Sequence, residues 1–123
     1  MDQGTHEAAP PIAWASDALR DVAAERRRQI EAEGWTPEHD DQHSNNTMSI
    51  AAACYALAGT RIDPRMVNVG WLWQETGWAS TWFKPKSRRN NLIRAAALLV
   101  AEIERLDRAD SASRHRAAAS WLK

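Results

Sequence analysis

Acidic side chains at helical spacing, followed closely by histidines, are the first residues whose types suggest chemistry. Glu25, Gln29 and Glu33 stand four residues apart, so on a helix they share one face. The string HDDQH follows at residues 39–43. Mg²⁺ and Mn²⁺ prefer carboxylate oxygens and keep several waters, so this pattern is compatible with a magnesium site. The candidate metal ligands are Glu25, Glu33, Asp40 and Asp41.

The same acidic residues have a plainer interpretation. Charged helix faces are common and no tight ligand spacing is present, which favours a solvated helix flank followed by an acidic turn. A zinc site fits the sequence less well, because the single Cys54 lies in the alanine-rich apolar stretch of residues 48–58. The sequence contains no glycine-rich phosphate loop, and Cys54 has no adjacent histidine to activate it as a nucleophile.

A second candidate site is the string WFKPKSRR at residues 82–89, which leads into a predicted long helix. The free N–H groups and the dipole of a helix N-terminus attract phosphate, and basic side chains add charge-assisted hydrogen bonds. Tryptophan rings upstream can stack on a nucleobase. The alternatives are a tryptophan cluster that fills the core and a solvated basic helix start. The candidate ligand-binding residues are Trp73, Trp82, Lys84, Lys86, Arg88 and Arg89.

Composition limits the classes of function. The 123 residues carry 16 basic and 16 acidic side chains, and this zero net charge argues against bulk nucleic-acid binding. No stretch approaches the roughly 18 apolar residues of a membrane span, and residues 1–11 lack the pattern of a signal peptide. One cysteine excludes an internal disulfide and fits a reducing compartment. We therefore expect a cytoplasmic protein without a membrane partner.

Helical periodicity without convincing strand alternation predicts an all-α, compact helical bundle. We expect one domain over residues 12–123, behind a flexible arm at residues 1–11. Ser16 is the expected N-cap of the first helix, and residues 34–46 form a loop. Residues 60–86 are expected to be an irregular, tryptophan-rich segment that contains one or two short helices. The expected helices cover residues 17–33, 48–58, 64–74, 87–107 and 113–122.

The helix expected at residues 87–107 is apolar on nearly every side. Leu92, Leu99 and Leu106 repeat every seven residues, and Ile93 and Val100 populate a second face. A helix of this kind is typically buried on several sides, so we expect it at the centre of the bundle. A domain this small also has little surface with which to cover such a helix, so the expected partners include a second copy of the chain in a homodimer.

Three strings, ERRRQIEAEGWTPEHDDQH, AAACYALA and WFKPKSRRNNLIRAAALLVAEIERLDR, lie within about residues 22–108. They resemble a small helical family encoded by bacteriophages and prophages, with an ERxRQ–EGWTxxHDD segment, an alanine-rich helix, a WKP loop and an AEIERLDR helix. The resemblance implies a phage context inside a bacterial host cell rather than a particular activity. Two departures, Thr47 in place of an acidic or amide residue and a longer tryptophan-rich loop, could alter or remove a ligand site.

Two weaker similarities point to activities. The carboxylate-bearing first helix is similar to the all-α MazG-type nucleoside triphosphate pyrophosphohydrolases, in which two helices supply acids to Mg²⁺. Glu25 and Glu33 fit that role, but neither MazG acid motif is clean and the second predicted helix has no acid. The strings RRRQIEAEGWT, HDD and MSIAAACYALAG are similar in spacing to the ryanodine-receptor repeat domain, a helical module associated with nucleotide ligands.

These observations leave three hypotheses. In the first, a small phage protein acts in counter-defence, an anti-CRISPR role included, by sequestering a nucleotide-like ligand or inhibiting a host defence protein. In the second, the chain hydrolyses a nucleoside triphosphate with a Mg²⁺-activated water. In the third, it is purely a protein–protein interaction module, anchored by exposed tryptophans. Because the second predicted helix lacks acids, we expect binding rather than catalysis.

Overall fold

The computed structural model describes residues 15–42 and 46–120. It confirms the all-α prediction, since this part of the chain contains helices and no strand. The arm predicted at residues 1–11, and also His43, Trp121 and Leu122, lie outside the described residues. The helices are α1 (Asp17–Glu31), α2 (Pro37–Asp40), α3 (Thr47–Leu57), α4 (Val69–Gln74), the 3-10 turn η1 (Ser80–Trp82) and α5 (Arg88–Ser120).

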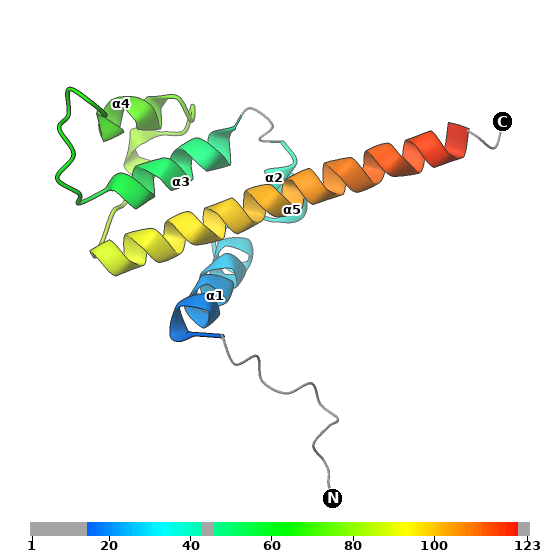
Figure 1. Cartoon of the computed structure of the whole chain (residues 1–123), viewed down its shortest axis with the longest axis horizontal. Coiled ribbons are helices and arrows are strands. Elements are labelled where there is room, and N and C mark those ends of the chain that lie inside the picture. Colours follow the sequence, from blue (N-terminus) through cyan, green and yellow to red (C-terminus); the bar gives the residue numbers. More distant parts are fainter. Residues whose placement is uncertain (1–14, 43–45, 121–123) are drawn as a thin grey trace, which may run out of the picture.

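The long helix α5 organises the other elements. Helices α3 and α4 lie on one side of it and α1 lies on the other, while α2 sits beside its middle (Figure 1). Alanines on both α3 and α5 let these two helices approach closely. No described helix is long and apolar enough to cross a membrane. The main buried cluster consists of Ala51, Ala52, Cys54, Tyr55, Trp73, Ala95 and Leu98.

Local signals in the sequence explain where several helices begin. The Ser16 hydroxyl accepts a hydrogen bond from the Leu19 amide at 3.2 Å, which confirms Ser16 as the N-cap of α1. The Ser87 hydroxyl accepts from the Asn90 amide at 3.2 Å at the start of α5. The predicted loop over residues 34–46 contains the additional short helix α2. Its cap is Thr36, whose hydroxyl accepts from the His39 amide at 3.2 Å, and proline occupies its first turn.

The predicted break after residue 107 is wrong, because α5 continues as one helix to Ser120. Residues 107–120 contain no proline or glycine and include five alanines, which favour the helical conformation. Arg114 and Asp110 form an i, i+4 ion pair at 2.7 Å, which supports the extension further. The last turns of α5 project beyond the rest of the bundle (Figure 1), and residues 109–119 are exposed.

The prediction that α5 is buried on several sides is wrong for one whole face. Helices α1 and α3 cover the sides that carry Ala97, Leu98 and Ala101, and these three residues are fully buried. The seven-residue repeat points away from both helices. As a result four large apolar side chains are between 42% and 56% exposed, namely Leu92, Leu99, Ile103 and Leu106.

Candidate ligand-binding groove

The segment between η1 and α5 lies against the phenol of Tyr55 on α3. The Tyr55 hydroxyl donates a hydrogen bond to the Trp82 carbonyl at 3.2 Å and accepts one from the Lys84 amide at 3.1 Å. It also accepts one from the guanidinium of Arg94, on α5, at 3.3 Å. One buried hydroxyl thus fixes the backbone of residues 82–84 relative to α3 and α5. A rigid backbone here positions the side chains that emerge from the segment.

Two hollows open where this segment meets α1 and α5. The larger has a volume of about 510 Å³ and the smaller of about 250 Å³. They share four cationic lining residues, so we treat them as one groove. The shared residues are Arg28, Arg94, Lys84 and Lys86. The larger hollow adds aromatic rings and the smaller adds Glu25 and two asparagines, which gives the groove an aromatic end and a polar end.

The two arginines of the groove are held by carboxylates. Arg28 donates to Glu25 at 2.7 and 2.8 Å and to Glu33 at 2.8 Å. Arg94 lies 3.6 Å from the Glu25 carboxylate. Burial raises the pKa of Glu25, but the hydrogen bonds and charge of Arg28, together with Arg94, outweigh burial and hold that pKa below its ordinary value. The hydrogen bond from Arg28 to Glu25 raises the pKa of Arg28, so both groups are charged.

The two lysines of the groove differ from its arginines. Within the described part of the chain, neither Lys84 nor Lys86 has a carboxylate within ion-pair distance. Four cationic and two anionic side chains line the groove, which leaves a local excess of two positive charges. In a chain of zero net charge, this local excess favours an anion.

Aromatic rings form the other end of the groove. Trp35 stacks on His39, with ring centroids 6.4 Å apart and planes 6° apart. Trp78 connects the two tryptophans of this end, since its ring centroid lies 5.8 Å from that of Trp35 and 6.1 Å from that of Trp82. Trp82 is 55% exposed although it is one of the largest apolar side chains in the protein. An exposed indole next to excess positive charge is suited to a ligand that carries both a flat ring and a phosphate.

The structure divides the six predicted ligand-binding residues into two groups. Trp82, Lys84 and Lys86 line the groove. Trp73, by contrast, is a core residue that is 3% exposed, and its indole N–H donates to the Ala79 carbonyl at 3.0 Å.

The two predicted arginines at the start of α5 also have structural partners. Arg88 donates to the Ala56 carbonyl at the end of α3, and Arg89 pairs with Asp21 of α1 at 2.8 Å. Both side chains therefore connect helices, and neither lines the two hollows that form the groove. The sequence could not show this, because their partners lie more than 30 residues away in the chain.

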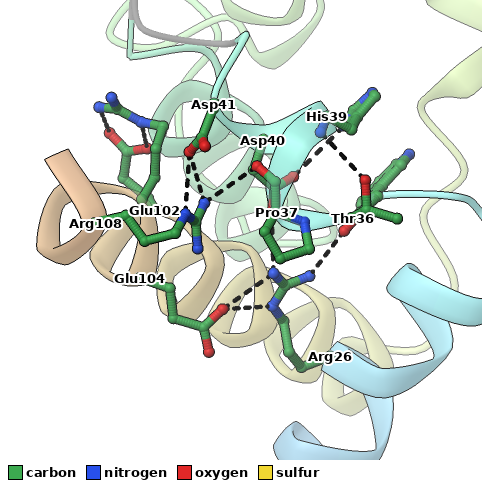
Figure 2. A network of polar contacts seen from close by, with 11 residues as sticks. Arg26, Thr36, Pro37, His39, Asp40, Asp41, Glu102, Glu104 and Arg108 are labelled. Atoms are coloured by element: carbon green, nitrogen blue, oxygen red, sulfur yellow. Dashed lines mark hydrogen bonds and ion pairs between the residues drawn. The ribbon is translucent and has the colours of Figure 1, made fainter. Parts of the chain in front are cut away.

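The four predicted metal ligands do not form one site. Glu25 and Glu33 meet at Arg28, whereas Asp40 pairs with Arg26 at 2.9 Å. Asp41 pairs with Arg108 of α5 at 2.8 Å (Figure 2). Arginine thus neutralises each carboxylate that a metal ion would require. Across residues 15–42 and 46–120, no group of three or more His, Cys, Asp and Glu side chains could hold a metal ion.

Sequence reasoning missed Trp35, Tyr55 and Arg94, which complete the groove. Tyr55 and Arg94 are 39 residues apart and belong to predicted helices, so their meeting depends on how α3 packs against α5. The one signal in the sequence was the isolated tyrosine within an alanine-rich helix. A buried tyrosine usually has a hydrogen-bond partner, which marks it as a point where another segment approaches.

No protein-family model, curated protein or solved structure matches this chain significantly.

Proposed function

We propose that this protein binds a nucleotide-like ligand, a flat ring joined to a phosphate, in the groove between α1, α5 and residues 82–86. The observation that carries the proposal is the placement of Lys84 and Lys86, both without a carboxylate partner among the described residues, beside the exposed ring of Trp82. The 510 Å³ of the larger hollow lies within the usual range of small-molecule sites, about 300–1,000 Å³.

The two ends of the groove suggest where the phosphate and the ring of the ligand bind. Phosphate oxygens accept charge-assisted hydrogen bonds from the lysine ammonium groups, which gain an anionic partner that the described residues do not supply. Arg28 and Arg94 are already positioned by Glu25 and add positive potential without having to be ordered. The ring of the ligand stacks at the aromatic end, on Trp82 or Trp35, in an interaction that tolerates different bases.

Binding is favoured over the hydrolase alternative by the placement of the acids. A Mg²⁺-dependent pyrophosphohydrolase needs several carboxylates that converge on the metal and the attacking water. Here Glu25, Asp40 and Asp41 are each paired with a different arginine, and α3 carries no acidic residue. Among the described residues, the groove therefore offers cations and aromatic rings that suit a nucleotide but no cluster of unpaired carboxylates for its hydrolysis.

The biological setting belongs to the same proposal. The resemblance to phage-encoded proteins leads us to propose that the ligand is a nucleotide-like molecule of the bacterial host and that binding sequesters it. A sequestering protein needs affinity and a slow dissociation rate but no turnover, which is consistent with the arginine-paired acids of this chain.

Calorimetric titration tests the proposed function. We expect nucleoside phosphates to bind, nucleosides without phosphate to bind much more weakly, and added salt to weaken the phosphate-dependent part. The double variant Lys84→Gln/Lys86→Gln should lose at least about tenfold in affinity, the effect of removing two charge-assisted contacts. Arg114→Gln, at the far end of α5, is the matched control for loss of surface charge and should bind as the wild type does.

The titration has two outcomes that contradict the proposal. If the double lysine variant keeps wild-type affinity, the ligand does not bind in this groove. If no nucleoside phosphate produces a heat signal, with or without Mg²⁺, the ligand class is wrong. A parallel pyrophosphate-release assay distinguishes binding from catalysis, because turnover would favour the hydrolase alternative.

A further inference from the structure

One face of α5 carries large apolar side chains that stay exposed, although the neighbouring residues Ala97, Leu98 and Ala101 are fully buried. We define it as the α5 stripe, which consists of Leu92, Leu99, Ile103 and Leu106. The successive intervals of seven, four and three residues are those of the seam of a coiled coil, in which two helices interlock side chains. The stripe covers 14 residue steps, or about 21 Å of helix. No described element of the chain covers it.

Charged residues border the stripe in a self-complementary arrangement. Arg89 and Asp107 are 18 residues apart, which is five full turns at 3.6 residues per turn, so they lie on the same edge of the helix. Their midpoint is residue 98, and the midpoint of the stripe is Leu99. Arg89 is exposed and pairs with Asp21 at 2.8 Å, whereas Asp107 is exposed and has no ion pair with a described residue.

We infer that the α5 stripe is the interface of a homodimer in which two copies of α5 pack antiparallel about a two-fold axis close to Leu99. In this arrangement Leu99 lies beside the partner's Leu99 at the axis, and Leu92 lies near the partner's Leu106. Arg89 then faces the partner's Asp107, and the symmetry produces this pair twice. The apolar stripe is removed from water, which is the main driving force for such an association.

Charge distinguishes the antiparallel from the parallel arrangement. In an antiparallel pair, each edge of one helix lies beside the same edge of the other helix, which runs in the opposite direction. Two residues on that edge at equal distances on either side of the axis therefore meet across the interface, and opposite charges at these positions attract. A parallel pair would instead place the basic starts of both helices, Lys86 to Arg89, side by side and give Asp107 no cation. The guanidinium of Arg89 has five N–H donors, so it can hold Asp21 and the partner's Asp107 together.

Sedimentation velocity over a range of protein concentrations tests the interface. We expect the wild type to shift from the 13.8 kDa monomer toward twice that mass as concentration rises. Leu99→Glu places two carboxylates next to each other at the axis and should raise the dissociation constant at least about tenfold. The matched control is Leu19→Glu, an equally exposed leucine (46%) on α1, which should dimerise as the wild type does.

Charge reversal tests the direction of the helices. Arg89→Asp and Asp107→Arg should each weaken the dimer. The double variant Arg89→Asp/Asp107→Arg should dimerise more tightly than Arg89→Asp alone. Arg89→Asp is the proper reference for this comparison, because both variants lack the ion pair between residue 89 and Asp21. Circular dichroism confirms that each variant stays helical. A wild type that is monomeric at all concentrations, a Leu99→Glu variant that still dimerises, or a double variant without restoration would each overturn the antiparallel homodimer.

Discussion

The guanidinium of Arg26 lies 2.9 Å from the carboxylate of Asp40, and both side chains are buried, with 8% and 2% of their surfaces exposed. The same guanidinium contacts Glu104 of α5 at 3.0 Å (Figure 2), and it donates to the carbonyl of Trp35 at 3.2 Å. One arginine thus joins α1, α2 and α5 and fixes the backbone of a tryptophan in the groove wall. Burial raises the pKa of Asp40, and Arg26 opposes that effect.

Replacing Arg26 should strongly destabilise the protein. The Arg26→Met variant leaves the buried Asp40 carboxylate without its cation, and loss of one partner of a buried pair costs about 3–5 kcal/mol in free energy of unfolding. Urea denaturation followed by circular dichroism measures this change. The double variant Arg26→Met/Asp40→Leu should recover most of the loss, because it removes the isolated charge as well.

Arg108→Met is the matched control for this first prediction. Arg108 pairs with Asp41 in the same region, but the two side chains are 34% and 50% exposed. Solvent screens such a pair, so its loss should cost less than about 1 kcal/mol. Equal destabilisation by the Arg26 and Arg108 variants would show that burial does not decide the strength of these two ion pairs.

The sequence predicts local features of this fold well and tertiary features poorly. The cap at Ser16, the start of the long helix near residue 87 and the all-α class depend on residues close together in the chain, and the structure confirms them. Periodicity shows that α5 is apolar on several faces. Which of these faces is covered by other helices depends on how many helices the chain can pack against α5. The exposure of Leu99 and Leu106 is therefore a property of the assembled bundle.

The residues of the candidate groove show the same difference between local and tertiary features. Trp82, Lys84 and Lys86 are adjacent in the sequence, and one string was enough to bring them together as candidates. The acids near α1 gave a misleading signal, since the sequence shows carboxylates but not the arginines that pair with them after folding, such as Arg26 of α1 at Asp40 and Arg108 of α5 at Asp41. The hydroxyl of Tyr55 also meets residues 82–84 only after folding, which is why sequence reasoning did not include it.

The lowered pKa of Glu25 makes part of the stability dependent on pH. The folded chain binds the Glu25 proton more weakly than the unfolded chain does, so the contribution of Glu25 to stability is fully present above the ordinary pKa of 4.5. It is lost as the pH falls below that value and through the lowered pKa of the folded state. The difference in unfolding free energy between wild type and Glu25→Gln should therefore shrink in acid.

Urea denaturation of both proteins at a series of pH values measures this second prediction. Glu31→Gln is the matched control, because Glu31 lies on the same helix, is exposed and has no ion pair with a described residue. A difference between wild type and Glu25→Gln that stays constant as the pH falls would contradict the linkage. It would mean that Arg28 and Arg94 do not favour the charged form of Glu25.

Removing the hydroxyl of Tyr55 should release the groove segment from α3. The Tyr55→Phe variant keeps the ring but leaves the Lys84 amide, the Trp82 carbonyl and Arg94 without that partner. We expect a loss of about 1–3 kcal/mol in unfolding free energy, typical of partly buried polar groups left unsatisfied. Hydrogen exchange by NMR should show faster exchange of the Lys84 amide, while the Asn90 amide, bonded to Ser87, stays unchanged. Unchanged exchange at Lys84 would show that Tyr55 does not fix the segment.

Two variants separate the groove from the start of α5 as the place of ligand binding. Trp82→Ala removes the exposed indole, and loss of one stacking contact with a base costs about 1–3 kcal/mol of binding free energy. Arg88→Ala should leave affinity unchanged, because Arg88 donates to the Ala56 carbonyl and does not line the groove. Calorimetry with the tightest-binding nucleoside phosphate makes the comparison. The opposite ranking would place the phosphate at the tip of α5.

The thiol of Cys54 should be chemically inert in the folded protein. Cys54 is fully buried between α3 and α4, where its Sγ lies 3.7 Å from the Val69 carbonyl, and burial raises its pKa to about 11. The thiolate is the reactive form, so alkylation near neutral pH requires the chain to open first. We expect iodoacetamide labelling, followed by mass spectrometry, to be slow in buffer and fast in urea. The Arg26→Met variant, which unfolds more readily, should be labelled faster than the wild type, whereas Arg108→Met should not. Rapid labelling of the wild type without denaturant would show that the contact between α3 and α4 opens independently of global unfolding.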